Sequence, residues 1–401
     1  MTIRVLIGTA YFESHRGGIE IVAGSLAREL QRRGAEVTWF ATDSSPPPAT
    51  TGSGCCASLS IGAWNITERR LGLPLPLPGP RGIATIWRGV KGADAVLLHD
   101  SLYPTNVVAM LAARWHRKPV VLVQHIAAVP YRNPLLRGVM GAANALIARP
   151  MLATADQVVF ISAAVAGHFS RVRFKVAPRL IFNGVDTDVF RLPPAGFDNG
   201  EARASLGLPV DGRVVLFVGR FVEKKGLHLI ERLARRRPDL TFALAGWGPI
   251  DPTDWRLPNV HVLSSLQGSS LVPLYQSSDV FVLPSVGEGL PLVLQEALAC
   301  GLPVICGRET AAADPGAGAL IEGVEIEGAD PDTAAVALAG RIDRVLAKNT
   351  GAHGAAAADA RHAYVRSRYS WTEAAGAYLS IMTSLVEPAT TLAADRASRT
   401  P

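Results

Sequence analysis

The sequence predicts an α/β protein with two Rossmann-type domains, because two series of buried strand patterns alternate with helix patterns and a break separates them. The first series of apolar runs lies at residues 3–8, 36–41, 95–99, 119–125 and 157–161. The second lies at residues 214–219, 240–246, 260–263, 280–284 and 304–305. Strands that alternate with helices imply parallel sheets with right-handed crossovers.

The break between the two series defines the expected domain boundaries. Residues 185–212 hold several prolines and glycines and no strand pattern, which is typical of an interdomain segment. We therefore expect an N-terminal domain over 1–184 and a C-terminal domain over 213–367, with a ligand in the crevice between them. A last clear helix is expected over 371–386. Residues 387–401 lack apolar periodicity and are expected to be a disordered tail.

The composition favours a globular protein and excludes several classes. The 401 residues are 48% hydrophobic and 18% charged, which allows ample core. The net charge is +6, but no basic stripe interleaved with aromatic residues indicates nucleic-acid binding. No apolar stretch is long enough to span a bilayer, and the chain begins with a strand pattern, so we expect a cytoplasmic protein. The four cysteines offer no spaced metal-binding set and are interpreted as reduced thiols.

One region of the N-terminal half allows two interpretations. Five basic residues surround the apolar, proline-rich segment 71–80, namely Arg69, Arg70, Arg81, Arg88 and Lys91. A peripheral face against an anionic membrane, on the inner side of the cell membrane near a lipid-linked acceptor, would have this composition. An ordinary surface loop accounts equally well for it, so both interpretations stay open.

The segment 287–305 places two carboxylates in unusual surroundings. Glu288 lies in a glycine-flanked loop, and Glu296 lies in an otherwise apolar helix that Pro291 begins and Gly301 ends. A carboxylate at the edge of an apolar surface is costly unless it meets hydrogen-bond donors. The hydroxyl groups of a sugar and of a ribose are such donors.

A second motif, Gly219-Arg220-Phe-Val-Glu-Lys-Lys225-Gly226, follows a strand. A nucleotide diphosphate brings about two negative charges, and a hydrogen bond to a charged group contributes roughly 1.5–3 kcal/mol. Arg220 and Lys225 are therefore expected to bind the diphosphate and to stabilise its departure. Lys224 is expected to be a solvated neighbour.

The two motifs together resemble the donor-site signature of glycosyltransferase family 4, the retaining enzymes with the GT-B fold. The resemblance covers nearly the whole chain. It implies two Rossmann-like domains facing across a cleft, with a C-terminal helix that crosses back to the N-terminal domain. It also implies that Glu288 contacts the transferred sugar and that Glu296 contacts the ribose of the nucleotide. One departure is Cys306-Gly-Arg-Glu-Thr310, where many relatives carry a glycine-rich loop that leads to Pro-Glu.

Further positions match the family in the loops after strands. Gly17-Gly18 stand before a helix whose first N–H groups suit phosphate or sugar oxygens. His125 ends a strand where the family often has a histidine facing the sugar, and His99 matches a second recurrent histidine. Gly246-Trp-Gly-Pro249 resembles a turn that lines the donor. The alternative is an ordinary tight turn for the glycine pairs, and a structural histidine with its hydrogen bonds made inside the protein for His99 and His125.

Asp186-Thr-Asp188 has the metal signature of another glycosyltransferase fold, but the string around it matches the hinge segment of GT-B enzymes. We therefore expect no required metal and no cofactor other than the donor substrate, a UDP- or GDP-sugar.

We expect a retaining glycosyltransferase that moves a sugar from this donor to a glycan, glycolipid or small-molecule acceptor. Glu288, His125, Arg220 and Lys225 are the expected catalytic residues. The expected donor-binding residues are Gly18, Gly219, Arg220, Lys225, Gly246, Glu288 and Glu296, with Gly17 and His99 as additional candidates. A non-catalytic partner subunit with this fold, or a nucleotide-sugar epimerase or phosphorylase, is the alternative.

Overall fold

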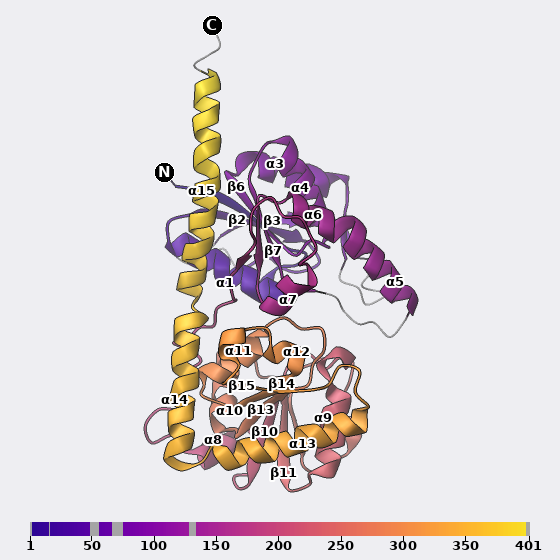
Figure 1. Ribbon diagram of the computed structural model, residues 1–401, viewed down its shortest axis with the longest axis vertical. Coiled ribbons are helices and arrows are strands. Elements are labelled where there is room, and N and C mark those ends of the chain that lie inside the picture. Colours follow the sequence, from indigo (N-terminus) through magenta and orange to yellow (C-terminus); the bar gives the residue numbers. More distant parts are fainter. Residues whose placement is uncertain (1, 16, 49–55, 66–74, 128–133, 398–401) are drawn as a thin grey trace. The chain divides into compact units, whose positions relative to one another are not determined.

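The computed structural model describes residues 2–15, 17–48, 56–65, 75–127 and 134–397. It confirms an α/β protein with two parallel sheets, each in its own compact unit (Figure 1). Unit 1 comprises Met1–Asn183 and Trp371–Pro401, and unit 2 comprises Gly184–Ser370.

The sheet of unit 1 has seven strands in the order β3-β2-β1-β6-β7-β8-β9, all parallel. Their bounds are β1 Arg4–Gly8, β2 Glu36–Thr42, β3 Ala57–Ile61, β6 Ala95–His99, β7 Val120–Gln124, β8 Gln157–Phe160 and β9 Arg179–Leu180. A separate antiparallel pair joins β4, Ala63–Trp64, to β5, Leu77–Pro78. Strands β6 and β7 are buried along their whole length, as expected for a parallel sheet covered on both faces.

Helices cover both faces of this sheet. They are α1 Gly18–Arg32, α3 Pro80–Gly92, α4 Pro104–Trp115, α5 Pro134–Ala143, α6 Arg149–Thr154, α7 Ala163–His168 and α15 Trp371–Ala397, with a π-helical turn at Asn144–Ala148 and a short 3-10 helix at Glu13–His15. Both α3 and α4 begin with proline, which loses no hydrogen bond in the first turn of a helix.

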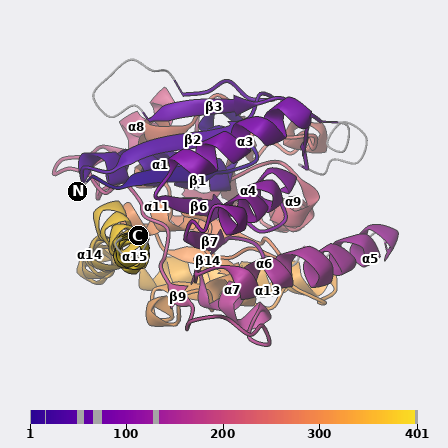
Figure 2. The same cartoon turned by 90° about the horizontal axis from the view of Figure 1, so that it is seen from above.

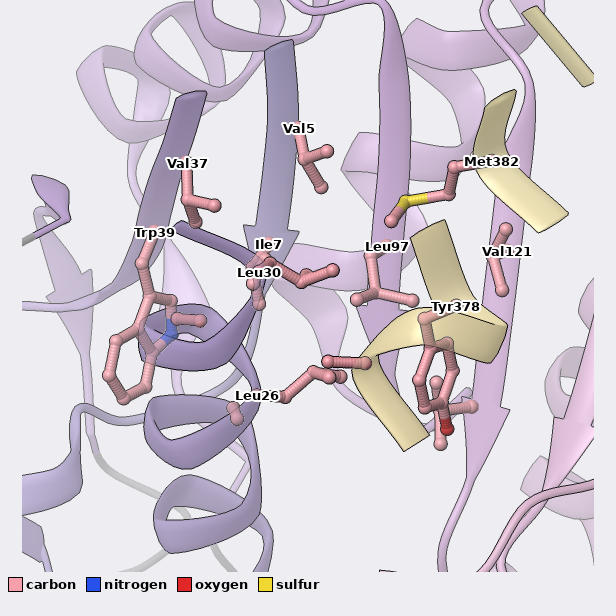
Figure 3. Close-up of a cluster of buried hydrophobic side chains, with 14 of the residues drawn as sticks. Val5, Ile7, Leu26, Leu30, Val37, Trp39, Leu97, Val121, Tyr378 and Met382 are labelled. Atoms are coloured by element: carbon pink, nitrogen blue, oxygen red, sulfur yellow. The ribbon is translucent and has the colours of Figure 1, made fainter. Parts of the chain in front are cut away.

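The C-terminal helix α15 belongs to the core of unit 1. Figure 3 shows its Tyr378 and Met382 beside Leu97 and Val121 of the sheet. The main chain of Thr372 accepts a hydrogen bond of 2.8 Å from Arg33 at the end of α1. Thus the helix packs on the N-terminal strands as expected. It continues to Ala397, beyond residue 386, and Pro388 lies within it.

The sheet of unit 2 has six parallel strands in the order β12-β11-β10-β13-β14-β15. Their bounds are β10 Arg213–Val218, β11 Leu240–Ala245, β12 Val260–Leu263, β13 Val280–Leu283, β14 Val304–Gly307 and β15 Ile321–Val324. The helices are α8 Asn199–Ser205, α9 Leu227–Arg236, α10 Val272–Ser277, α11 Leu292–Ala299, α12 Arg308–Ala311, α13 Pro331–Lys348 and α14 Gly351–Arg368. Gly301 ends α11 with a φ of 77°, the left-handed conformation that its position predicts.

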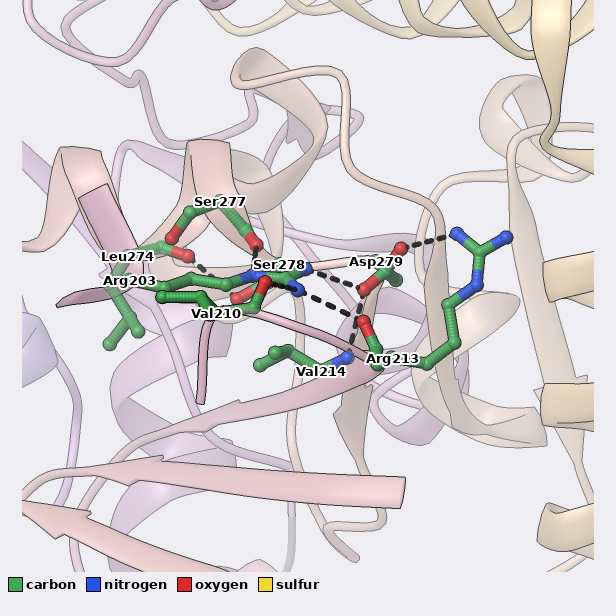
Figure 4. Close-up of polar contacts among 9 residues, drawn as sticks. Arg203, Val210, Arg213, Val214, Leu274, Ser277, Ser278 and Asp279 are labelled. Carbon is green, nitrogen blue, oxygen red and sulfur yellow. Dashed lines mark hydrogen bonds and ion pairs between the residues drawn. The ribbon is translucent and has the colours of Figure 1, made fainter. Parts of the chain in front are cut away.

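The whole of the expected interdomain segment, residues 185–212, belongs to unit 2, which begins at Gly184. The attachment depends on Arg203 of α8, which is buried (Figure 4). Its guanidinium donates to the carbonyl oxygens of Ser277 and Gly212 and to the carboxylate of Asp279, each at 2.9 Å. Asp279 also accepts from Arg213 and from the backbone N–H of Val214, at 2.7 and 2.8 Å. This network fixes α8 to the first strand of the second sheet.

Cys300 and Cys306 are buried free thiols, Cys56 is buried as well, and Cys55 lies outside the described residues. Arg69, Arg70 and residues 71–74 lie outside them as well. In the part of the chain that the structure describes, no helix is both long and apolar enough to cross a membrane.

Candidate functional site

Residues of the two donor-site motifs lie at the carboxyl ends of strands in unit 2. Gly219-Arg220 follows β10, Gly246-Trp247 follows β11, and the loop to Glu288 follows β13. These strands are neighbours, so their carboxyl ends meet at one edge of the sheet, where ligands bind in folds of this type. The main chain joins the turns, because the N–H of Phe221 donates to the carbonyl of Trp247 at 2.7 Å and that of Val286 to the carbonyl of Lys224 at 3.0 Å.

Two glycines allow this close approach of main chains. Gly246 has a φ of 156°, and a Cβ atom there would overlap the carbonyl oxygen of Gly219. Gly226 has a φ of 75°, and a Cβ atom there would overlap the carbonyl oxygen of Pro284. Larger residues would therefore push the turns apart.

Lys225 and Glu288 form an ion pair at this edge. The distance from Lys225 Nζ to Glu288 Oε1 is 3.0 Å, and their side chains are only 13% and 14% exposed. Lys224 Nζ lies 3.6 Å from the same oxygen, but its side chain is 42% exposed. Burial alone would raise the pKa of Glu288, but the two ammonium groups outweigh it and hold that pKa below its usual value. Glu288 is therefore an ionised carboxylate with cations on one side.

Glu296 has a different partner. The hydroxyl of Tyr275 in α10 donates to Glu296 Oε2 at 2.8 Å, and burial raises the pKa of Glu296 to about 7. The sequence alone predicted no role for Tyr275. The available signal was a tyrosine in the apolar run 271–275, because a buried tyrosine hydroxyl usually has a hydrogen-bond partner.

Arg220 lies against an aromatic ring. Its Cζ is 4.8 Å from the ring centroid of Trp247, in cation–π geometry, and both side chains are exposed. The Gly-Trp-Gly-Pro turn was expected from the sequence, but a role of its tryptophan was not. Stacking of this kind restricts the guanidinium to fewer orientations at the edge of the sheet.

The two expected histidines of unit 1 contact each other at the ends of β6 and β7. His99 Nδ1 lies 2.9 Å from His125 Nε2, and the rings are stacked with centroids 5.2 Å apart. Burial lowers the pKa of His99 to about 3, and burial together with His99 lowers the pKa of His125 well below its usual value. Both rings are thus neutral near neutral pH, and one donates a hydrogen bond to the other.

Asp100 follows His99 with a φ of 70°, a left-handed conformation that is unusual for a residue other than glycine. Asn106 holds this turn by donating to the carbonyl oxygens of His99 and Asp100 at 2.7 and 2.9 Å. Burial raises the pKa of Asp100 to about 6. Strained, buried polar turns of this kind concentrate at functional sites. The sequence analysis did not select Asp100, because its conformation depends on contacts with α4.

Gly17-Gly18 lie at the start of α1, as expected. Gly18 is the first helical residue, and a Cβ atom there would meet no atom within 4 Å. A Cβ atom on Gly17 would overlap the carboxylate of Glu20. An acidic side chain therefore already lies at this helix start, which the sequence analysis did not anticipate.

Asp186 stabilises the turn in which it lies, because its carboxylate accepts hydrogen bonds from the backbone N–H groups of Asp188 and Val189 at 3.0 and 3.3 Å. Among the residues that the structure describes, no group of three or more His, Cys, Asp or Glu side chains is arranged to hold a metal ion. Gly219, Arg220, Lys225, Gly246 and Glu288 thus share one edge of unit 2. Glu296 contacts Tyr275 in that unit, and the remaining candidates belong to unit 1.

Two family models match the chain, one in each half. The model described as Glycosyltransferase Family 4 matches residues 16–189, and the one described as Glycosyl transferases group 1 matches residues 212–347. The chain belongs to glycosyltransferase family 4. It is similar to D-inositol 3-phosphate glycosyltransferase of Xylanimonas cellulosilytica, with 29% identity over 91% of each chain. It is equally similar to the enzyme of that name from Mycobacterium tuberculosis CDC 1551, with 29% identity over 91% of this chain and 78% of the other.

Solved structures confirm the GT-B fold of this family 4 glycosyltransferase. A sucrose-phosphate synthase of Thermosynechococcus elongatus matches with a TM-score of 0.73 and 20% identity over 96% of this chain and 100% of the other. HepE of Anabaena in complex with UDP-glucose matches with a TM-score of 0.68 and 20% identity over 95% of this chain and 100% of the other.

Proposed function

We propose that this glycosyltransferase moves a sugar, with retention of anomeric configuration, from a UDP- or GDP-sugar to a carbohydrate or lipid-linked acceptor without a required metal. Unit 2 would bind the donor and unit 1 the acceptor. The observation that carries this proposal is the buried pair of Lys225 and Glu288 at the carboxyl edge of the second sheet. A cation and a carboxylate that share a dry site suit the two ends of a nucleotide sugar, its anionic diphosphate and its hydroxyl-rich sugar.

Lys225 and Arg220 would bind the diphosphate. When the bond to the sugar breaks, negative charge grows on the departing diphosphate, and two fixed cations stabilise that charge more than they stabilise the ground state. Lys225 would then exchange part of its contact with Glu288 for phosphate oxygens. Glu288, ionised because of its cationic neighbours, would accept hydrogen bonds from the sugar hydroxyls.

Glu296 would bind the ribose of the nucleotide. Its carboxylate is already oriented by the hydroxyl of Tyr275 at Oε2. The two ribose hydroxyls can donate to the remaining acceptor positions of the carboxylate. Tyr275 would thus be a positioning residue, because it acts on the ribose only through Glu296.

His125 would act in catalysis, with its ring oriented by the contact with His99. Because both rings are neutral near neutral pH, the pair offers one fixed hydrogen bond rather than a positive charge. No covalent nucleophile is assigned. Relatives named for an inositol phosphate make phosphorylated polyols the first acceptors to assay, followed by glycans and glycolipids.

The first experiment is a calorimetric panel of UDP-, GDP- and ADP-sugars with a metal chelator present, on the wild type and on Glu296→Ala. One nucleotide sugar should bind the wild type and bind the variant at least tenfold more weakly. Product formation with a phosphorylated polyol, analysed for its anomeric configuration, then tests the transfer. Tight donor binding without transfer or donor hydrolysis would favour the alternative of a non-catalytic partner, and conversion of the free donor to an isomer would favour an epimerase.

A further inference from the structure

An apolar, basic surface covers the outer side of α3 and α4 in unit 1. Helix α3 packs beside α4, and β5 packs against both, as Figures 1 and 2 show for the helices. Five large apolar side chains on these elements and on β4 are exposed to solvent, and we call them the apolar face: Trp64, Leu77, Ile83, Leu111 and Trp115. Trp115 is 75% exposed, Trp64 62% and Leu111 60%, which is far more than packing within the unit requires.

The apolar face has one part on the two helices and one part on the β4–β5 ribbon. Leu111 and Trp115 are one turn apart on α4, and Ile83 and Trp87 are one turn apart on α3. The rings of Trp87 and Trp115 meet across the two helices, with centroids 6.3 Å apart. Trp64 and Leu77 are directly paired across β4 and β5, so their side chains share one face of that ribbon.

The charges on the two helices of the apolar face have one sign, whereas the exposed Asp43 accepts a hydrogen bond from the backbone N–H of Ala63 in the β4–β5 ribbon. Helices α3 and α4 contain four basic residues and no acidic residue; the basic residues are Arg81, Arg88, Lys91 and Arg114, all exposed. Asp94, which follows α3, is already paired with Arg4 at 2.7 Å. Any partner of this surface must therefore accept apolar and aromatic side chains together with an excess of positive charge.

We propose that this surface docks on an anionic lipid bilayer. Tryptophan is the residue that prefers the boundary between headgroups and acyl chains, and basic residues beside it are attracted to anionic headgroups. The interaction is peripheral. It uses α3, α4 and the β4–β5 ribbon, whereas the sequence alone directed attention to the residues around 71–80.

Flotation of the full chain with vesicles tests the proposal. At low salt the wild type should float with phosphatidylcholine vesicles that contain phosphatidylglycerol and stay in the soluble fraction with phosphatidylcholine alone. Trp115→Ser and Leu111→Ser should each lower the bound fraction several-fold. Arg81→Glu and Arg88→Glu should each weaken binding at least about fivefold, the factor expected for the loss of one basic residue near an anionic surface.

Matched controls lie in unit 2, where Val336→Ser changes an exposed apolar residue and Arg344→Glu reverses an exposed charge. Neither should alter flotation. A wild type that never floats, or face variants that float like the wild type, would overturn the proposal. Loss of self-association in Trp115→Ser without any change in flotation would instead identify a second copy of the chain as the occupant. Measurement of nucleotide-sugar binding by the same variants separates a failure of membrane docking from a failure of the proposed function.

Discussion

The ammonium group of Lys225 lies 3.0 Å from the carboxylate of Glu288. The residue expected to bind phosphate and the residue expected to bind the sugar therefore neutralise each other in the unliganded protein. Removal of one member would leave the other charge largely buried without its closest partner, which is costly. A donor bound as proposed would meet charges that are already in place, and only Lys225 would have to exchange part of its contact with Glu288 for phosphate oxygens.

Replacement of Lys225 by alanine should reduce turnover at least tenfold with a smaller change in KM, because the cation acts mainly on the charge that develops in the transition state. Lys224→Ala is the matched control, since Lys224 is a neighbouring, more exposed lysine that lies farther from Glu288. It should change turnover less than threefold. Steady-state kinetics on both variants checks this difference. Equal rates for wild type and Lys225→Ala would reject the phosphate role of Lys225.

Trp247→Ala should weaken the binding of a nucleoside diphosphate about two- to fivefold, because an exposed cation–π contact with Arg220 contributes about 0.5–1 kcal/mol. Binding of the nucleoside alone should not change, and Trp247→Phe should recover most of the affinity. A double-mutant cycle isolates the effect, since Trp247→Ala should cost nothing further in an Arg220→Ala background. Equal losses with and without Arg220 would mean that Trp247 acts on the ligand directly.

Arg203→Ala should destabilise unit 2 by about 3 kcal/mol, because the variant removes the donor to the carbonyl oxygen of the buried Ser277 and one of the two cations of Asp279. Arg203→Lys should recover only part of this loss, since an ammonium group cannot donate in all three directions of the guanidinium. Hydrogen exchange of peptides from α8 and β10 measures the effect. The control Arg235→Ala removes an exposed pair with Glu231 one helical turn away and should cost at most about 0.5 kcal/mol.

Local patterns predicted most of the fold and only part of the candidate site. Apolar runs located the central strands, but β15 was missed because Glu322 and Gly323 interrupt its short apolar pattern. The motifs placed Arg220 and Glu288 at strand ends, since glycines next to each residue mark these loops in the sequence. The partners Tyr275 and Trp247 could not be assigned in the same way. Their roles arise when α10 packs against α11 and when two strand-end turns meet, and these contacts join residues far apart in the chain.

Glu296 should make donor binding dependent on pH. Its pKa of about 7 lies above the ordinary value of a glutamate, so it holds a proton in part of the unliganded molecules at neutral pH. Ribose hydroxyls that donate to the carboxylate favour its ionised form, and binding therefore releases a proton. Affinity should rise from about pH 5.5 to about pH 7.5 and then level off. Calorimetry in buffers of different ionisation enthalpy counts the released proton, and Glu296→Gln should abolish both the release and the slope.

Glu296 should also make the stability of unit 2 depend on pH. Between about pH 4.5 and 7 the folded protein binds more protons at Glu296 than the unfolded chain does, so this contribution decreases as the pH rises through that window. Thermal unfolding of Glu296→Gln should have a flatter dependence on pH over this range. An unchanged profile would mean that the carboxylate is better solvated than its contact with Tyr275 indicates.

The histidine pair should give unit 1 the opposite dependence. Below about pH 6.5 the unfolded chain protonates His99 and His125, whereas the folded protein keeps both rings neutral because burial lowers their pKa values. The unfolded state then binds more protons, and the stability of unit 1 should fall as the pH decreases from about 6.5 toward 5. Hydrogen exchange resolved by peptide separates this trend from that of unit 2, since β6 and β7 should lose protection in acid. His99→Gln should reduce the loss of stability below about pH 6.5 and should retain one hydrogen bond to His125. An unchanged loss of stability in acid would mean that the pair accepts a proton without unfolding.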